Sequence, residues 1–320
     1  PMLWKVLDLQ NNYWQGMKNM KAGGGAMSLY QSKLRVRPVT GELTLEGIDK
    51  FFKELPDMKV GSPKNPSQYD PNGIMLEIAL ADIHFALEPN KLETDVIERF
   101  QFVIMDIVRR IQAMNIKIEK IIVPGLGDVL HFDTASQTTT KGTQIDAKLN
   151  HQEMFKLACR MMIWAYDTLS ELAPVEAFIL PGNHDLMSSY FLATSLFYKF
   201  EFDPAVDVVV EEHSRTWREW GLVLLGFAHG DFAKARLAKW LHVEAREAWG
   251  RTSWAEIHVA HKHHQITNED NGVILRHLPT ITPDDKWHYD RAFVGAVRAT
   301  MSFLWDKEAG LREQWYTIVK

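Results

Sequence analysis

The chain has 320 residues, of which 46% are apolar and 24% charged, and its formal net charge is −5. This length allows one large core or a core with a small appendage, and the acidic balance lacks the basic footprint that usually signals nucleic-acid binding. No apolar stretch approaches a membrane span, and the opening residues do not form a secretory signal. The single Cys159 excludes an internal disulfide. We therefore expect a cytoplasmic protein without a membrane segment.

The first region, residues 1 to about 70, shows no sustained periodicity and predicts an irregular extension with one short helix over 45–55. Its glycine triplet at 23–25 is not followed by the Gly-Lys-Ser/Thr of a phosphate loop, which favours a flexible linker. The turn-rich segment 61–67 marks the boundary to a second region, residues 71–320. The extension offers candidate contacts to a partner protein or to a phosphate backbone, namely Trp4, Trp14, Arg35 and Arg37.

From residue 74 onward, apolar runs alternate with amphipathic stretches. The pattern predicts strands at 74–81, 118–123, 175–180, 222–227 and 257–260, long helices at 92–116 and 154–172, and further strands within 272–319. Such alternation is typical of an α/β fold. In open α/β folds, ligands bind beyond the carboxyl ends of the strands, which directs attention to the residues that follow each predicted strand.

Polar blocks stand at these strand ends. In chain order they are Asp82-Ile-His84, Gly127-Asp128, Gly182-Asn-His-Asp185, His229-Gly-Asp231 and His261-Lys-His263. Together they supply the carboxylate, imidazole and amide groups that hold divalent cations, and alternate residues of an extended segment point the same way. Taken singly, each residue could equally be a helix cap or a core residue. As an ordered set, the blocks predict two adjacent metals that share a water and clamp phosphoryl oxygens, with Asp128 giving one oxygen to each metal.

These blocks resemble the signature of the calcineurin-like metallophosphoesterases, which runs Asp-x-His, Gly-Asp, Gly-Asn-His-Asp/Glu, His and Gly-His-x-His. The resemblance implies a four-layer α/β/β/α sandwich of two mixed sheets. It also implies a dinuclear centre, with manganese as the first expectation and iron, zinc or nickel as alternatives. One metal is implied at Asp82, His84, Asp128 and His263, and the other at Asp128, Asn183, His229 and His261. Ala260 stands where this family usually has glycine, a small-for-small exchange.

His184 follows the predicted ligand Asn183 but is not itself among the predicted metal ligands. We therefore expect it to protonate or hydrogen-bond the leaving-group oxygen. Asp185 or another carboxylate would orient its ring, and a metal-bridging hydroxide would attack phosphorus. A possible substrate rim comprises His131, Asp133, Thr140, Lys141 and His288, although a solvated loop, a salt-bridged turn or packing would also account for these residues. Protein phosphatases carry Asp-Arg after the Gly-Asp block; this chain does not, which argues against that activity.

The segments 127–133 and 138–143 and the tail around 285–288 look like phage and prophage members described as DNA-repair-exonuclease-like, of the SbcD type. For a phage-encoded chain, the host cytoplasm would be the location. The first functional hypothesis is therefore a phosphodiesterase that cleaves DNA or RNA, with a DNA-repair protein as a possible partner. The second is a small-molecule phosphohydrolase acting on nucleotides, cyclic nucleotides or phosphomonoesters. The third is a non-catalytic scaffold subunit of a replication or repair complex. The sequence leaves the oligomeric state open.

Overall fold

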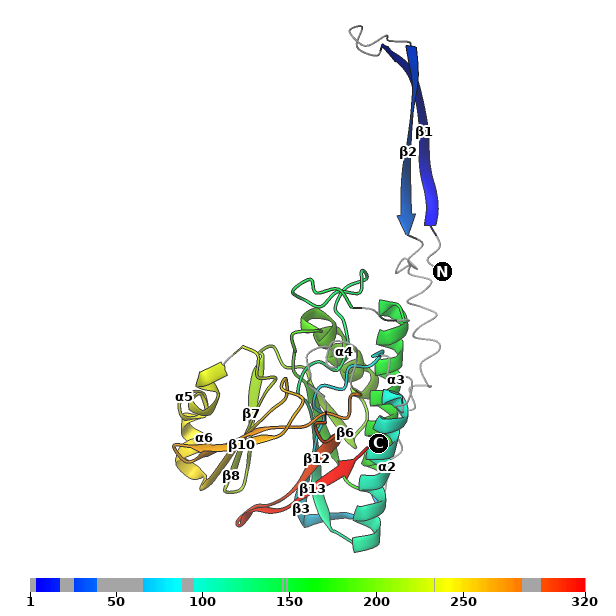
Figure 1. Cartoon of the computed structure of the whole chain (residues 1–320). Helices are drawn as coiled ribbons and strands as arrows, with labels where there is room; N and C mark the ends of the chain where they lie inside the picture. Colours follow the sequence, from blue (N-terminus) through cyan, green and yellow to red (C-terminus); the bar gives the residue numbers. More distant parts are fainter. Residues whose placement is uncertain are drawn as a thin grey trace. The chain divides into compact units, whose positions relative to one another are not determined.

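The computed structural model describes residues 4–17, 26–38, 66–87, 95–145, 147, 149–232, 234–283 and 295–319. The chain forms two compact units, residues 1–57 and residues 58–320, so the boundary predicted at about residue 70 falls inside the second unit. Each unit has its own strands, and Figure 1 shows the helices within the second. None of the described helices is both long and apolar enough to cross a membrane.

The first unit contains a β-hairpin, which corrects the prediction of an irregular extension. Strands β1 (Trp4–Met17) and β2 (Ala26–Pro38) pair antiparallel, with Met17 opposite Ala26 and Trp4 opposite Pro38. The alternation of polar and apolar residues over 33–37 carries the period-two signal of a strand, which the scattered aromatics obscured. The predicted helix over 45–55 and the glycine triplet lie outside the described residues.

The second unit is built on two sheets. The larger has six strands in the order β13-β12-β3-β4-β5-β6, of which β3 to β6 run parallel and β12 is antiparallel to both neighbours. Their bounds are β3 (Tyr69–Ala79), β4 (Ile118–Gly125), β5 (Val175–Ile179), β6 (Val206–Val209), β12 (Ala299–Asp306) and β13 (Gly310–Ile318). The smaller sheet has the order β10-β11-β9-β8-β7, with β11, β9 and β8 parallel. Its strands are β7 (Arg215–Trp220), β8 (Val223–Ala228), β9 (Trp254–Val259), β10 (Ile266–Asp270) and β11 (Val273–His277).

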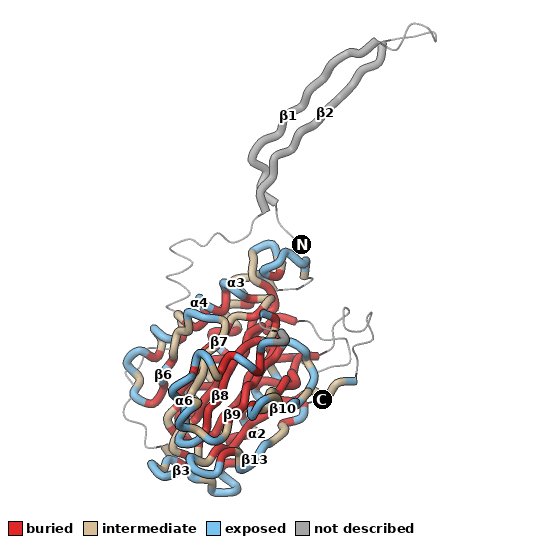
Figure 2. The backbone as a smooth tube through the Cα atoms, turned by 90° about the vertical axis from the view of Figure 1, so that its left-hand side faces the viewer, coloured by how far each residue is buried: buried red, intermediate tan, exposed pale blue. Residues whose placement is uncertain are grey.

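Helices cover the outer faces of both sheets, which completes the predicted four-layer sandwich and confirms the fold class. The helices α2 (Val96–Met114), α3 (His151–Ser170) and α4 (Leu186–Phe200) pack on the larger sheet, and η2 (Lys234–Lys239), α5 (Leu241–Glu244) and α6 (Arg246–Arg251) on the smaller one (Figure 1). Aromatic and aliphatic side chains from both sheets fill the space between them, including Phe178, Phe227 and Trp305. Figure 2 shows the resulting buried strands and the partly exposed helices. The parallel strands of both sheets thus end near the same edge of the sandwich.

Local sequence explains where α2 and α3 begin. The side chain of Asp95 accepts a hydrogen bond from the backbone N–H of Ile97 (2.9 Å), which caps α2. Asn150 and Glu153 form a reciprocal capping box at the start of α3. For α4 the cap comes from a distant residue, because Asp133 accepts hydrogen bonds from the first-turn amides of Met187 and Ser188. The loop after β4 is therefore tied to the loop after β5.

Candidate metal centre

Seven candidate ligands follow the ends of five strands, as the sequence predicted. Asp82 and His84 follow β3, Asp128 follows β4, Asn183 follows β5, His229 follows β8, and His261 and His263 follow β9. The larger sheet thus provides four of them and the smaller sheet three. The structure brings these side chains together in two groups that could each hold a metal ion.

The first group consists of Asp82, His84 and His263. His84 Nε2 lies 3.3 Å from His263 Nε2, and His263 Nε2 lies 3.7 Å from Asp82 Oδ1. Asp82 is fully buried; its Oδ2 accepts a hydrogen bond from the backbone N–H of His261 (2.8 Å), whereas its Oδ1 has no hydrogen-bond partner among the described residues. A buried carboxylate oxygen without a partner is costly unless a cation or donor satisfies it. This oxygen therefore fits a metal ligand.

The second group consists of Asp128, His229 and His261, with Asn183 beside them. His229 Nδ1 faces the carbonyl oxygen of Leu126 at 2.8 Å, and because a carbonyl only accepts, this nitrogen carries the proton. His229 Nε2 is then the ligand atom, 3.3 Å from Asp128 Oδ2 and 3.1 Å from Asn183 Oδ1. A backbone carbonyl on the outer nitrogen is the usual way in which proteins orient a metal-binding histidine.

A single oxygen of Asp128 connects the two groups. Its Oδ2 lies 3.9 Å from His84 Nε2 and 3.3 Å from His229 Nε2, whereas its Oδ1 accepts a hydrogen bond from the backbone N–H of His184 (2.7 Å). Oδ2 is therefore the oxygen that approaches an imidazole of both groups, and the assignment of one carboxylate oxygen to each metal stays a prediction.

Two glycines make this close approach possible. A Cβ atom on Gly182 would lie 2.0 Å from Asp128 Oδ1, and one on Gly127, which has φ +86°, would lie 2.7 Å from His229 Nδ1. Any larger residue at either position would displace the carboxylate or the imidazole. The glycines of the Gly-Asp and Gly-Asn blocks therefore belong to the geometry of the site.

The ligands themselves have strained backbones. A positive φ, between 47° and 68°, occurs at Asp82, His84, Asp128, His261 and His263. Non-glycine residues in this region cost of order 1–3 kcal/mol each, and they persist only where the surrounding structure imposes them. Such residues gather at functional sites, so the strain supports a functional role for this edge of the sandwich.

Burial and mutual charge shift the pKa values of the group. Burial raises the pKa of Asp82 to about 8 and lowers the pKa of His84 well below its ordinary value. Burial alone would also raise the pKa of Asp128, but the charge and hydrogen bond of His229 outweigh it, so this pKa lies well below its usual value. Burial opposes a charge on His229, yet Asp128 and Asp82 raise its pKa to about 10. A proton on His229 is thus the main countercharge to the buried Asp128 carboxylate, whereas the raised pKa of Asp82 favours its neutral form at pH 7. A divalent cation would supply that charge and leave His229 Nε2 unprotonated for ligation.

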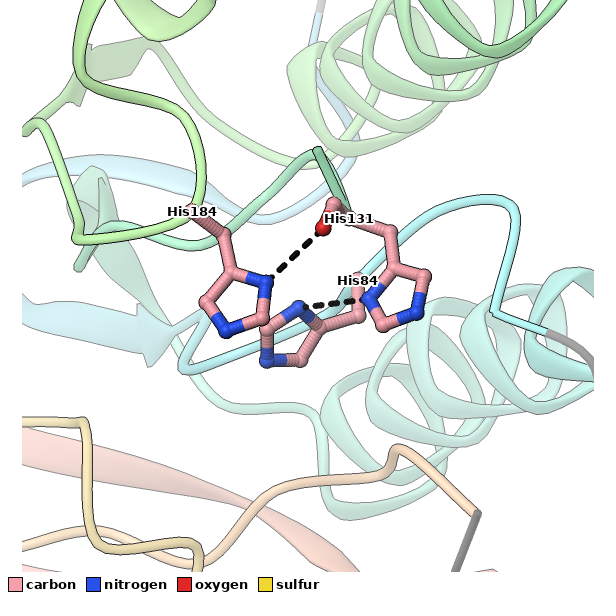
Figure 3. A group of neighbouring side chains, drawn as sticks. All are labelled: His84, His131 and His184. Atoms are coloured by element: carbon pink, nitrogen blue, oxygen red, sulfur yellow. Dashed lines mark hydrogen bonds between the residues drawn. The ribbon is translucent and has the colours of Figure 1, made fainter. Parts of the chain in front are cut away.

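Three histidines from three loops meet beside the first group. Figure 3 shows His84, His131 and His184, whose nitrogen atoms lie close enough to form a third possible metal-binding set. His184 Nδ1 faces the carbonyl oxygen of His131 at 2.8 Å and therefore donates to it, which leaves Nε2 as the atom available to a substrate. His131 Nδ1 lies 3.3 Å from His84 Nδ1, and the His131 and His184 rings stack with centroids 5.6 Å apart.

Asp185 does not orient the His184 ring, which corrects the prediction made from the sequence. Its Oδ1 accepts hydrogen bonds from the backbone N–H groups of Asp128 (3.2 Å) and Gly182 (2.9 Å), and its Oδ2 accepts one from Leu130 (3.0 Å). The carboxylate is fully buried. Asp185 therefore holds the loops after β4 and β5 together, and the carbonyl of His131 orients His184.

The predicted rim residues separate into different roles. His131 is buried inside the site, while Asp133 caps α4 and accepts a hydrogen bond from the hydroxyl of Thr140 (2.8 Å). The Thr140 hydroxyl in turn accepts one from the backbone N–H of Leu186 (3.2 Å). Asp133 and Thr140 thus fix the segment that carries His184, and their assignment to the substrate rim stays a prediction. Lys141 is 73% exposed and remains a rim candidate. His288 lies outside the described residues.

The structure adds Asp231, which the sequence analysis noted in a block but did not assign. Its side chain is 4% exposed, and neither carboxylate oxygen has a hydrogen-bond partner among the described residues. Lys141 Nζ lies 3.9 Å from Asp231 Oδ2. The negative charge of Asp231 acts to raise the pKa of His261, although burial and the charge of His229 lower that pKa overall. In the sequence, the only sign that Asp231 lies near the candidate site is its position two residues after His229.

Comparisons with known proteins found remote matches among solved structures only. Neither protein-family profiles nor curated sequences match the chain. Among solved structures, it is similar to a novel archaeal phosphodiesterase at 13% identity and a TM-score of 0.36, covering 77% of this chain and all of that one. It is similar to Vps29 complexed with zinc from Entamoeba histolytica at 14% identity and a TM-score of 0.32, covering 76% and 99% of the two chains. A predicted phosphoesterase from Streptococcus pneumoniae TIGR4 gives 9% and 0.30, covering 76% and 98%. Similarity at this level carries no argument about chemistry, which must come from the site.

Proposed function

We propose that this protein is a dinuclear metal-dependent phosphodiesterase, and that its substrate is DNA or RNA. The observation that carries the proposal is the shared Asp128 Oδ2, which lies within 4 Å of an imidazole from each of the two ligand groups. Carboxylate, imidazole and amide donors in this arrangement suit manganese, with iron, zinc or nickel as alternatives. The ligand set predicted from the sequence is complete, which disfavours a non-catalytic scaffold.

Bound at these groups, two divalent cations would lower the pKa of a water and neutralise charge on the phosphoryl oxygens. The residues of the chain supply the rest. His184 Nδ1 is fixed by the His131 carbonyl, so a second proton on its Nε2 can be delivered to the leaving-group oxygen. The backbone of His184 is held in turn, because its N–H donates to Asp128 Oδ1. The proton donor and the ligand groups are thereby kept at a fixed separation.

A nucleic-acid substrate is supported by the resemblance of residues 127–133 and 138–143 to phage exonuclease-like proteins of the SbcD type. It is also supported by Lys141, an exposed cation 3.9 Å from Asp231 Oδ2, because lysine side chains neutralise backbone phosphates. The same resemblance suggests a DNA-repair protein as a partner.

The test is hydrolysis by protein stripped of metal and reconstituted with manganese. Bis-p-nitrophenyl phosphate, p-nitrophenyl phosphate and labelled single- and double-stranded DNA and RNA would be assayed side by side. We expect cleavage of the diester and of a nucleic acid, with little turnover of the monoester. Turnover of the monoester alone would identify a small-molecule phosphohydrolase. Bound manganese without hydrolysis of any substrate would contradict the enzymatic proposal.

A matched control separates the site from the rest of the protein. His213→Ala removes an exposed histidine between β6 and β7 that belongs to none of the candidate ligand groups, and should leave activity unchanged. His229→Ala removes a buried ligand candidate and should abolish hydrolysis together with manganese binding at the second group. Equal activity of the two variants would show that the measured hydrolysis does not arise at this site.

A further inference from the structure

A chain of buried charges crosses the interface between the two sheets. Glu77 lies on β3 of the larger sheet, His258 and Glu256 lie on β9 of the smaller sheet, and Arg276 lies on β11 beside it. Glu77, Glu256 and His258 are fully buried, and Arg276 is 9% exposed. His258 Nδ1 is 2.6 Å from Glu77 Oε1, and its Nε2 is 3.1 Å from Glu256 Oε2.

In this network of charges, both ring nitrogens of His258 and both carboxylate oxygens of Glu77 have hydrogen-bond partners. Both ring nitrogens of His258 face carboxylate oxygens, so both must donate, which only the imidazolium form does. The other Glu77 oxygen accepts from Trp305 Nε1 at 2.9 Å. Glu256 accepts from Trp254 Nε1 at 3.0 Å and from the guanidinium of Arg276. These are the ionisable groups that face His258 from the described elements packed around it.

Such a network is not an efficient source of stability. Removing charges from water carries a large penalty, and well-packed apolar residues of similar volume often stabilise a core as much or more. The surroundings here are apolar and aromatic, with the Phe303 ring centroid 4.3 Å from that of His258. The attested advantage of a buried polar network is that it fixes one register among several that apolar packing would tolerate.

The network lies on the same two strands as candidate metal ligands, so the register that it fixes also affects the first ligand group. Asp82 follows Glu77 by five residues on the chain leaving β3, and His263 follows His258 by five residues on the chain leaving β9. Their side chains meet in the first ligand group, where Asp82 Oδ1 is 3.7 Å from His263 Nε2. In addition, Asp82 Oδ2 accepts the backbone N–H of His261. Any slip of β9 against β3 would therefore change the distances within the first ligand group directly.

We propose that Glu77 and His258 are positioning residues, which lock the two sheets in the register that assembles the first metal site from Asp82, His84 and His263. This inference rests on the proposed function, because it assumes that this group holds a cation. It assigns the two residues no contact with substrate or metal.

The experiment compares manganese binding with stability in three variants. Glu77→Gln keeps an acceptor oxygen for His258, whereas the double variant Glu77→Leu/His258→Phe replaces the connection with apolar groups. Glu176→Gln is the matched control: Glu176 on β5 also bridges the sheets, through Arg218 on β7, but it lies near the start of its strand, away from the ligands. Binding of manganese alone is followed by calorimetry, spin coupling between two bound ions by electron paramagnetic resonance, and stability by thermal unfolding of the chelated proteins.

We expect the double variant to bind manganese at the first site about 10- to 100-fold more weakly and to lose the spin-coupled signal, as when groups that orient metal ligands are removed. Glu77→Gln should retain most of the manganese affinity. Glu176→Gln should retain all of it, even if it lowers the thermal stability more than the double variant does. Unchanged manganese affinity in the double variant would overturn the positioning role, as would a loss that simply follows thermal stability across all three variants. Wild-type protein that binds manganese but hydrolyses nothing would contradict the proposed function alone, whereas failure of the wild type to bind manganese would overturn both.

Discussion

At the carboxyl ends of the parallel strands, buried Asp82 and Asp128 face imidazoles and backbone amides. At the opposite ends of the same sheets, Glu176 lies between Lys120 and Arg218, and its carboxylate is paired with both. The end that carries Glu176 balances this carboxylate with Lys120 and Arg218, which are permanent cations. At the carboxyl ends of the strands, a proton on His229 balances the charge of Asp128, and a metal ion can replace that countercharge. The two ends of the sandwich therefore differ in how their carboxylates are balanced, and only the end with the candidate metal ligands has a countercharge that a cation can replace.

The sharpest way to break this comparison is to remove the charge that joins the two ligand groups. Asp128→Asn should lose the paired metals and reduce hydrolysis to the level of the metal-free protein, because Oδ2 no longer carries an anionic charge for either cation. Metal content after dialysis, measured beside turnover, checks this. Two metals at full occupancy in the variant would contradict the bridging role.

His184→Ala should keep the metals and lose about 10²- to 10⁴-fold in turnover of a diester with a poor leaving group, since a positioned proton donor contributes about that much. An activated diester such as bis-p-nitrophenyl phosphate should be affected far less, because its leaving group needs no proton. The ratio of the two rates is the measurement. Undiminished cleavage of the poor substrate would remove His184 from the mechanism.

Metal removal should destabilise the protein through the ligand end alone. At a free manganese concentration 100 times the dissociation constant, one site adds about 2.7 kcal/mol to the free energy of unfolding. Chemical unfolding with manganese and with a chelator measures this difference. Glu176→Gln should show the same manganese-dependent gain as the wild type, since its ion pairs lie at the other end. A smaller gain in that variant would show that the two ends are coupled.

Glu176→Gln itself should lower the free energy of unfolding by about 1.5–3 kcal/mol at neutral pH, the range for hydrogen bonds to a charged group. Burial acts to raise the pKa of Glu176, but Lys120 and Arg218 outweigh it and hold the pKa below the ordinary 4.5. The carboxylate therefore stabilises the fold above pH 4.5, and this contribution disappears as the pH falls through the lower folded-state value. Urea unfolding of both proteins across acidic pH should show the gap closing. A gap that does not change with pH would assign the effect to packing.

The sequence alone predicted those features of the fold and of the candidate site that depend on a local pattern of residues. Each polar block directly follows its strand, so the edge at which Asp82, Asp128 and His229 meet could be predicted from the apolar runs alone. The α/β alternation in the second unit was predictable for the same reason. These features depend on strand periodicity and on the common direction of parallel strands.

Other features depend on contacts between distant residues. Asp185 looked like a partner for the adjacent His184, but its carboxylate binds amides on the loop that carries Asp128. Helix α4 was not predicted, because large apolar residues such as Phe191 and Tyr198 are exposed on it and blur the helical stripe. The β1–β2 hairpin was missed because its pairing joins residues on either side of a glycine-rich segment. For Asp185 and α4, nothing local specifies the outcome; in the hairpin, the alternation over 33–37 is a local strand signal, but it does not specify the segment with which that strand pairs.

The central claim is that seven residues from two sheets form one dinuclear metal centre. The most direct test is anomalous diffraction from crystals of the protein reconstituted with manganese. Two manganese peaks roughly 3.5–4 Å apart are expected. One should lie among Asp82, His84 and His263, the other among Asn183, His229 and His261, with Asp128 Oδ2 between them. A single peak, or manganese bound elsewhere with this edge empty, would contradict the account.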